Sequence, residues 1–348
     1  MELRRRAIRT ALGVIAATGA DRALAPLARG RGVILMGHHV RPATPRGFEP
    51  NRLLEITPDF LDRTLRLLGR EGFDLVALDE VPERLARPGR PFAALTFDDG
   101  FRDFADHAWP VLRAHGAPAT LFVTVDYALG RGRLWWVELE EAIRRLDRVS
   151  VGVDGRRLEL DAGTDARKRA AFEAVYWALR RLPEGELRAA VAELADAAGI
   201  DAGALVTERC LALDEIAALA GEPGLAVGAH TLTHPRLATL DERDARLEIA
   251  GSRAALETRL GQPVRHLAYP VGDPTSAGPR EFRLAQEAGF VTAVTTRPGH
   301  VFADHAGHLH ALPRVSLNGL HQSEAEMRAL LSGVPFWLRD RGRRVDAA

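Results

Sequence analysis

The segment AALTFDDGFRDF, residues 93–104, places two carboxylates directly after an apolar run. The run has the composition of a buried strand, and Gly100 marks a sharp turn after it. Neighbouring carboxylates raise the free-energy cost of ionising each other. The pair Asp98–Asp99 is therefore either a solvated turn or part of a site where a cation offsets the repulsion.

Strand-like and helix-like segments alternate on both sides of this pair. The predicted strands are residues 32–40, 74–78, 91–97, 118–125, 224–230, 264–269 and 291–296. Amphipathic helices are expected between them, among others over 57–72, 241–260 and 279–288. This alternation indicates an α/β fold with a parallel sheet, either closed as a barrel or open and doubly wound.

Residues 127–210 break the alternation. They read as a helix that starts with Trp135 and Trp136, a hairpin around Asp154-Gly155 and two further helices. We interpret this segment as an inserted helical and hairpin subdomain. The paired tryptophans favour an anchoring role in its core, with stacking on sugar rings as the alternative.

Composition narrows the function classes. The chain has 348 residues, 46 % of them hydrophobic, so a large core is available and global disorder is excluded. Lys+Arg and Asp+Glu both number 47, which argues against a nucleic-acid-binding protein. Cys210 is the single cysteine, so the chain forms no internal disulfide, as in reducing compartments.

Residues 1–31 form a separate N-terminal segment, MELRRRAIRTALGVIAATGADRALAPLARGR. Its arginines and short apolar stretch predict a basic amphipathic helix that packs on the domain or rests on an anionic membrane surface. We expect a cytoplasmic protein. Contact of this helix with the inner face of the membrane, and an exported form with a weak signal peptide, are the two alternatives.

Three polar segments follow predicted strands, where parallel α/β folds build their sites. They are Asp98-Asp99-Gly100, HTLTH at His230–His234, and AYPVGD at residues 268–273. Two histidines four residues apart can face one metal ion if the segment makes a helical turn. Two imidazoles and one carboxylate form an open site for a catalytic divalent metal, zinc by preference.

LTFDDGF followed by HTLTH resembles the polysaccharide deacetylase family, also called the NodB-homology domain or carbohydrate esterase family 4. The resemblance spans residues 32 to about 317, so residues 32–348 are expected to form one such domain with the insertion 127–210. It implies an irregular (β/α)-barrel of about seven strands. It also implies that Asp98 is the general base and that Asp99, His230 and His234 hold the metal, usually zinc.

The third family motif departs from the usual pattern. It often reads Arg-x-Pro-Tyr-Gly, whereas this chain has Ala268-Tyr269-Pro270-Val271-Gly272 and so lacks the arginine that orients the base. Tyr269, Pro270 and Val271 match the segment that meets the substrate and the oxyanion, with the Val271 N–H as the donor. The fourth motif is not recognisable in AVTTRPGHV, residues 293–301.

The fifth motif, HLHALPRVSL at residues 308–317, resembles the Leu-Pro-Arg variant of the family. We predict that Arg314 supplies the guanidinium that the third motif lacks. His310 is the first candidate for the general acid, and His39, at the end of the first strand, is the second.

The resemblance implies a metal-dependent hydrolase of carbon–nitrogen bonds other than peptide bonds. The expected activity is removal of the acetyl group from an N-acetylated sugar in an oligo- or polysaccharide, for example a chitooligosaccharide. The alternatives are a catalytically degenerate glycan-binding protein on the same scaffold and a hydrolase of another amide or of an O-acetyl ester. The expected partner is thus an N-acetylated glycan and not a nucleic acid.

Overall fold

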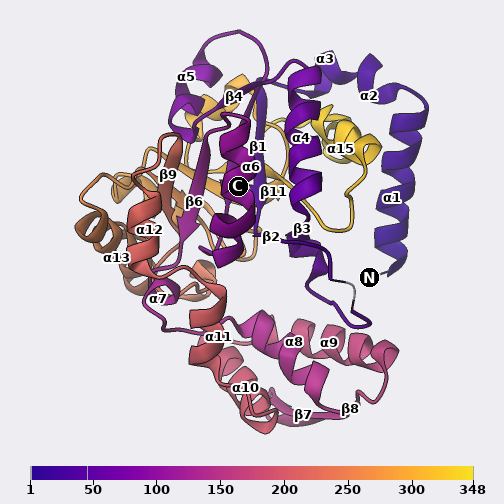
Figure 1. The fold of residues 1–348 in the computed structure, drawn as a ribbon, viewed down its shortest axis with the longest axis vertical. Helices are drawn as coiled ribbons and strands as arrows, with labels where there is room; N and C mark the ends of the chain where they lie inside the picture. The colour runs from indigo at the N-terminus through magenta and orange to yellow at the C-terminus, as the bar shows by residue number, and fades with distance from the viewer. Residues whose placement is uncertain (1, 45, 348) are drawn as a thin grey trace.

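The computed structural model describes residues 2–44 and 46–347. The first residue of the expected N-terminal segment 1–31 and the last residue of the expected domain 32–348 lie outside the described residues. Seven parallel strands form a closed barrel, because β5 at the end of the strand order β1-β12-β11-β10-β9-β6-β5 pairs back with β1 (Figure 1). These strands are β1 (Gly32–Gly37), β5 (Phe92–Phe97), β6 (Ala119–Val123), β9 (Leu225–Ala229), β10 (His266–Ala268), β11 (Thr292–Pro298) and β12 (Leu312–Ser316). The expected (β/α)-barrel is confirmed.

The identity of one barrel strand differs from the prediction. The predicted strand at 74–78 is β4 (Asp74–Val76), which pairs with β5 outside the closed ring. The seventh barrel strand is β12, which the sequence pattern does not predict. Its sequence misleads because Pro313 lacks an N–H for the ladder and Arg314 places a charge where an apolar side chain is expected.

Helices surround the barrel. They are α4 (Pro58–Arg70), α5 (Val81–Ala86), α6 (Trp109–Ala114), α7 (Val125–Ala128), α12 (Leu213–Leu219), α13 (Glu242–Leu260), α14 (Pro279–Glu287), α15 (Glu324–Leu331) and α16 (Val334–Arg339). Local signals set their ends: the Thr57 hydroxyl accepts the Phe60 N–H at the start of α4, and left-handed Gly261 ends α13. Short turns are η1 (Arg52–Leu54), η2 (Leu78–Glu80), η3 (Phe104–Ala108), η4 (Leu237–Thr239) and η5 (Ala303–Gly307).

A second lobe lies beside the barrel, at the bottom of Figure 1. It contains α8 (Trp135–Arg145), β7 (Arg148–Val153), β8 (Arg156–Asp161), α9 (Asp165–Leu179), α10 (Glu184–Ala197) and α11 (Ala202–Arg209). The lobe has its own apolar cluster, in which Trp135 and Trp136 are 5 % and 7 % exposed. Burial of both indoles gives them the anchoring role rather than an open stacking surface.

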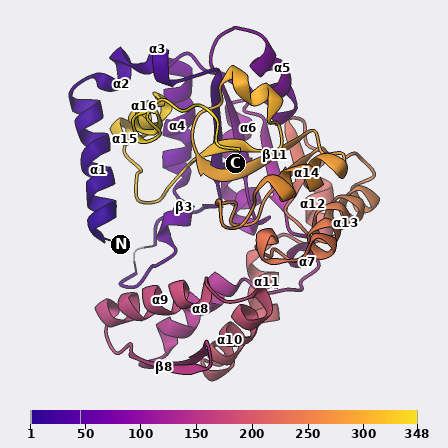
Figure 2. The ribbon, with the colours of Figure 1, turned by 180° about the vertical axis from the view of Figure 1, so that it is seen from behind.

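The N-terminal segment forms α1 (Glu2–Ala17), α2 (Ala20–Ala23) and α3 (Ala25–Ala28). Leu12 and Ile15 of α1 are buried in a cluster that includes residues of α15 and α16. Figure 2 shows these three helices side by side. Ile8 and Val14 on the same helix are exposed. Within the described chain, no helix combines the length and apolar character that crossing a bilayer requires.

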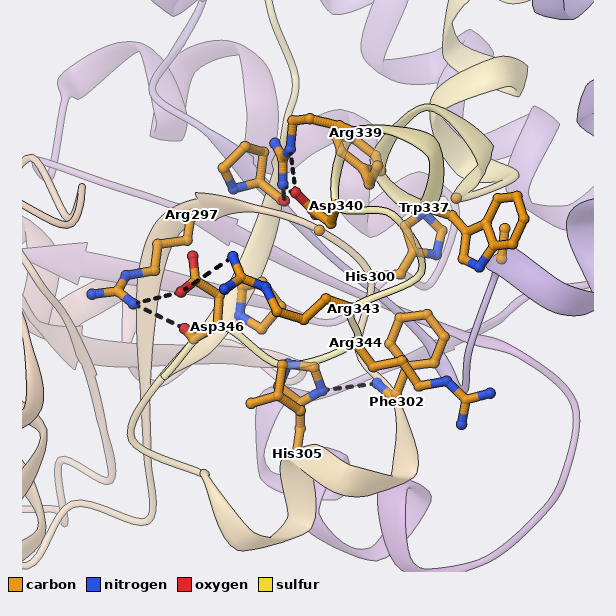
Figure 3. A pocket seen from close by; sticks show the side chains of 17 residues that line it. Arg297, His300, Phe302, His305, Trp337, Arg339, Asp340, Arg343, Arg344 and Asp346 are labelled. Carbon is orange, nitrogen blue, oxygen red and sulfur yellow. Dashed lines mark hydrogen bonds and ion pairs between the residues drawn. The ribbon is translucent and has the colours of Figure 1, made fainter. Parts of the chain in front are cut away.

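Residues 340–347, which follow α16, fold back over β11. Together with α16 they border a pocket (Figure 3). Arg297 donates to the backbone oxygen and carboxylate of Asp346, and Nδ1 of His305 accepts the N–H of Phe302. None of the candidate catalytic, metal-binding or substrate-binding residues lines this pocket. The candidate site lies elsewhere, at the carboxyl ends of the barrel strands.

Candidate active site

Strand ends bring the chemical groups together. The ladder pairs Gly37 of β1 with Phe97 of β5, so the next residues, His38 and Asp98, emerge beside each other. The Asp98 N–H donates to the Gly37 carbonyl, which fixes this register at the barrel rim. Asp99 continues from β5, and His230 follows the end of β9.

Asp99, His230 and His234 form a compact group of buried ligand atoms, all within 4.8 Å of one another. Oδ1 of Asp99 lies 3.4 Å from Nε2 of His230 and 3.3 Å from Nε2 of His234. In the described part of the chain this carboxylate oxygen is buried and has no hydrogen-bond partner. A buried acceptor without a partner is costly, and a cation between these three atoms would satisfy it.

The Nδ1 atom of His230 already has a hydrogen-bond partner. It donates to the Ala268 carbonyl at 2.7 Å, which leaves the Nε2 lone pair facing Asp99. Metal-binding histidines are oriented in this way by a carbonyl or carboxylate. The residues present therefore fit a divalent cation.

Electrostatics agree with this arrangement. Burial raises the pKa of Asp99, but the imidazoles of His230 and His234 outweigh it and hold the pKa well below the ordinary value. Burial lowers the pKa of His230, and the neighbouring carboxylates of Asp99 and Asp98 raise it overall. Asp99 is thus ionised and faces two imidazoles, a combination that suits a cation ligand set.

The histidine segment does not form the helical turn that the spacing suggested. It bends, with Thr231 and His234 both at positive φ, 67° and 62°. Glu248 of α13 holds the bend by accepting the N–H groups of Leu232 and Thr233 at 2.8 and 2.9 Å. The histidines converge through a strained loop that a neighbouring helix stabilises.

Positive φ is concentrated at the site. Asp99 and Val271 also adopt it, at 73° and 61°, so these residues and the two in the histidine bend all have backbones that L-residues disfavour. Only Asp154 and Arg341 share this property among the other described residues that are not glycine. Such strain at a buried cluster of ionisable groups is typical of functional sites.

Arg314 and Asp98 form a bidentate pair in the barrel interior. Nη1 and Nη2 of Arg314 lie 2.7 and 2.6 Å from the two oxygens of Asp98. The guanidinium also donates to the Thr295 carbonyl and to the Thr96 hydroxyl, and its side chain is fully buried. Arg314 therefore makes the contact that the sequence predicted for it.

This pair keeps Asp98 ionised. Burial raises the pKa of Asp98, but the charge and hydrogen bonds of Arg314 outweigh burial, and the pKa stays below its ordinary value. Because both oxygens already accept from Arg314, the carboxylate has one orientation. An ionised, oriented carboxylate beside a cation site can act as a general base.

The third-motif residues separate into two roles. Val271 is half-buried, and among the described residues nothing accepts its N–H. Tyr269 is fully buried, and its hydroxyl donates to the His310 carbonyl at 2.9 Å. The expected substrate contact of Tyr269 is therefore wrong, because its side chain packs in the core. Pro270 is also buried, and its carbonyl accepts the Gly272 N–H in the turn.

The expected role of His310 as general acid is wrong. His310 precedes β12 and its Nε2 bonds to the Phe290 carbonyl, which precedes β11. In a parallel barrel this position is at the amino ends of the strands, opposite Asp98. His310 thus cannot reach the group of ionisable residues at the carboxyl ends.

His39, the second candidate for the general acid, lies at the carboxyl ends of the barrel strands, but its side chain is directed to Asp103. It begins β2 (His39–Val40), which pairs with β3 (Glu55–Ile56), and its Nδ1 bonds to Asp103 at 2.7 Å. His38, which the motifs do not single out, is the residue whose pKa responds to Asp98 and Asp99. The doublet HHV is the available signal in the sequence, but only strand register decides which histidine faces the acids.

Burial lowers the pKa of His38, and Asp98 and Asp99 oppose this without reversing it. A lowered pKa favours the neutral imidazole, so His38 can deliver a proton only after it has taken one up.

Comparison with known proteins agrees with this geometry. The family profile described as "Polysaccharide deacetylase" matches residues 86–148 and 203–293, which include the acid pair, both histidines and the third motif. No curated protein matches the sequence at a significant level.

Several solved structures share the fold. The Streptococcus pyogenes deacetylase PplD, in complex with acetate, has 19 % sequence identity and a TM-score of 0.57, with 86 % of this chain and 97 % of that chain covered. A polysaccharide deacetylase from Bacillus cereus has 18 % identity and a TM-score of 0.54, with coverages of 86 % and 68 %. IcaB from Ammonifex degensii has 18 % identity and a TM-score of 0.52, with coverages of 86 % and 96 %.

The profile covers Asp98, Asp99, His230 and His234, and the barrel brings these four residues together. Over the matched residues, the sequence is that of a polysaccharide deacetylase domain.

Proposed function

We propose that this protein is a metal-dependent deacetylase that hydrolyses the N-acetyl group of a sugar in an oligo- or polysaccharide. The observation that carries the proposal is the bidentate contact between Arg314 and Asp98 beside the Asp99–His230–His234 group. It provides an ionised base next to a cation site. The similar S. pyogenes deacetylase is described with bound acetate, which is the product expected here.

Asp99, His230 and His234 would hold the cation, and two nitrogens with one oxygen favour zinc. A divalent cation in such a site polarises an acyl oxygen and lowers the pKa of water. The remaining chemistry belongs to the chain. Asp98 takes the proton of the attacking water, and the free Val271 N–H donates to the oxygen that gains charge at the acyl carbon.

The departing amine needs a proton, and we assign its delivery to His38. Its place beside Asp98, which takes the proton of the attacking water, supports this role. His38→Gln is expected to lower kcat by about a hundredfold or more, because general acid–base groups contribute roughly 10²–10⁴-fold. Steady-state kinetics of acetate release measure the effect. Unchanged kcat in a variant that unfolds at the wild-type denaturant concentration would contradict the assignment.

The proposed activity is tested by acetate release from N-acetylglucosamine oligomers, with an O-acetylated xylan and an acetylated peptide as comparison substrates. We expect release from the amino sugar, loss of activity after chelation, and recovery on addition of zinc. Metal content measured on the same samples should fall and recover in parallel. Release from the xylan alone would favour the ester alternative, and binding of the oligomers without release would favour the degenerate glycan-binding alternative.

A further inference from the structure

The inserted lobe contacts the active-site loops through the connection between α9 and α10. Residues 180–188, which include the first turn of α10, bond to the loops that follow β9 and β10. The family profile leaves out residues 149–202, so it does not describe this connection. The mechanism proposed above uses none of its side chains.

One contact of the lobe is with the bend that carries His234. Nη2 of Arg188 in α10 donates to the Thr233 carbonyl at 2.7 Å, and its Nε donates to Glu184, one turn earlier, at 3.2 Å. On the barrel side, Glu248 accepts the N–H and the hydroxyl of Thr233 at 2.9 and 2.6 Å. Every polar group of Thr233 thus has a partner, and the partner of its carbonyl comes from the lobe.

This contact bears on cation binding because the bend is strained. His234, at a φ of 62°, is one of the three residues that could hold the cation, and Thr231 in the same bend has a φ of 67°. A backbone at positive φ persists only where surrounding contacts hold it. Without the bond from Arg188 the bend can relax, and Nε2 of His234 then loses its fixed place beside Asp99.

A second contact of the lobe holds the turn after Val271. Nη2 of Arg180 donates to Oδ2 of Asp273 at 2.9 Å, and the Arg180 side chain is 10 % exposed. Oδ1 of Asp273 accepts the N–H of Thr275 at 2.9 Å and the hydroxyl of Ser276 at 2.8 Å. Asp273 therefore organises the turn two residues after Val271, and Arg180 fixes its carboxylate from the side of the lobe.

The barrel in turn holds the connection. Arg236, between β9 and η4, is buried and donates to the carbonyls of Arg180 and Leu182. Its Nε lies 3.5 Å from the carboxylate of Glu184. Donors thus run in both directions across this boundary, and hydrogen bonds to charged groups are the stronger ones. The connection 180–188 is therefore a fixed support for both loops.

We propose that Arg188 and Arg180 are positioning residues, through which the inserted lobe sets the geometry of the cation ligands and of the oxyanion donor. Arg188 acts through the bend that carries His234, and Arg180 acts through the turn that follows Val271. The proposal rests on the deacetylase function above and deepens it, because it gives the lobe a part in the reaction. The two arginines should differ in effect: Arg188 controls cation affinity, and Arg180 controls turnover at full cation occupancy.

Zinc affinity tests Arg188 and is measured by competition with a chromogenic chelator, which requires no turnover. Arg188→Met is expected to weaken zinc binding about tenfold or more, because residues that orient metal ligands typically contribute about 10–100-fold. Arg188→Lys should recover part of the affinity, since an ammonium can still donate to the Thr233 carbonyl, and it covers the case in which Arg188→Met does not fold. Arg145→Met is the matched control, because Arg145 donates to two carbonyls within the lobe, those of Ala198 and Gly199. It should keep the wild-type affinity.

Turnover tests Arg180. Arg180→Met is expected to lower kcat for acetate release about tenfold at saturating zinc and to leave zinc affinity unchanged, because a misplaced donor stabilises the oxyanion less well. Arg180→Lys keeps the charge beside Asp273, so it should recover part of kcat. Arg167→Met is the control, since Arg167 also bonds to a carboxylate of an aspartate, Asp161, at 2.8 Å, but on the exposed surface of the lobe.

The outcomes separate this proposal from the deacetylase function. Wild-type zinc affinity in Arg188→Met overturns the role of Arg188, and wild-type kcat in Arg180→Met overturns that of Arg180. Equal losses in the control variants would show that the lobe only stabilises the fold, which also overturns the proposal. If the wild type binds zinc but releases acetate from no substrate, the deacetylase function fails. The zinc affinity of Arg188→Met still decides whether the lobe positions the cation ligands.

Discussion

Asp98→Asn is expected to lower kcat by about three orders of magnitude and to leave cation binding intact. Asp98 makes its hydrogen bonds to Arg314, whereas the ligand atoms belong to Asp99, His230 and His234. The amide oxygen of asparagine still accepts from the guanidinium, so the barrel interior keeps one of the two bonds. An amide has no basic lone pair at neutral pH, and loss of a general base typically costs 10²–10⁴-fold.

Acetate release gives kcat, and zinc content by metal analysis gives occupancy of the cation site. Asp59→Asn, on the surface of α4 where the carboxylate is 90 % exposed, is the matched control and should keep wild-type turnover. Near-wild-type kcat for Asp98→Asn would remove the general-base role. Loss of zinc together with activity would move Asp98 from the base to the ligand set.

Arg314→Met is expected to destabilise the fold by about 3–5 kcal/mol and to lower kcat about a hundredfold in the molecules that remain folded. Removing one partner of a buried ion pair leaves an uncompensated charge, which carries this cost. Asp98 would also lose the two bonds that orient it, and a misplaced catalytic group costs about 10²-fold. Arg314 is a positioning residue, because it acts through Asp98.

Arg314→Lys separates positioning from packing. Lysine restores a positive charge but not the planar pair of bonds or the bond to the Thr295 carbonyl, so we expect partial recovery of stability and smaller recovery of kcat. Denaturant unfolding and acetate release on the same variants give both numbers. Arg66→Met is the control, since its pair with Asp62 is exposed and is worth about 0–1 kcal/mol. Full kcat in Arg314→Met would show that Asp98 needs no partner.

Local sequence patterns predict much of the framework. The apolar run before Asp98 forms β5, and the helices expected over 57–72 and 241–260 form α4 and α13, capped by Thr57 and Asp241. These features depend on neighbours in the chain: burial of a short apolar run and capping of orphan N–H groups. For the same reason the residues next to the Asp-Asp-Gly and HTLTH motifs are enough to place both motifs at strand ends.

Features that depend on contacts between distant segments of the chain are predicted less well from the sequence. The pattern does not indicate β12, because Pro313 and Arg314 are unfavourable in an isolated strand, yet Arg314 is accommodated because Asp98, Thr96 and Thr295 satisfy it inside the barrel. Motif position favours His310 as the acid, although strand direction puts it at the opposite end. His38 and His39 are indistinguishable by residue type.

By itself, the sequence determined the α/β alternation, the neutral composition that disfavours nucleic acid, and the residue types of the cation site. These follow from periodicity, charge and spacing, which are properties of neighbouring residues. The tertiary structure alone decided that β1 pairs with β5 so that His38 faces Asp98, that Arg314 approaches from β12, and that Trp136 of the inserted lobe contacts His234. Each of these depends on closure of the barrel, because the free energy of burying a charged or aromatic side chain is set by partners that are distant in the chain.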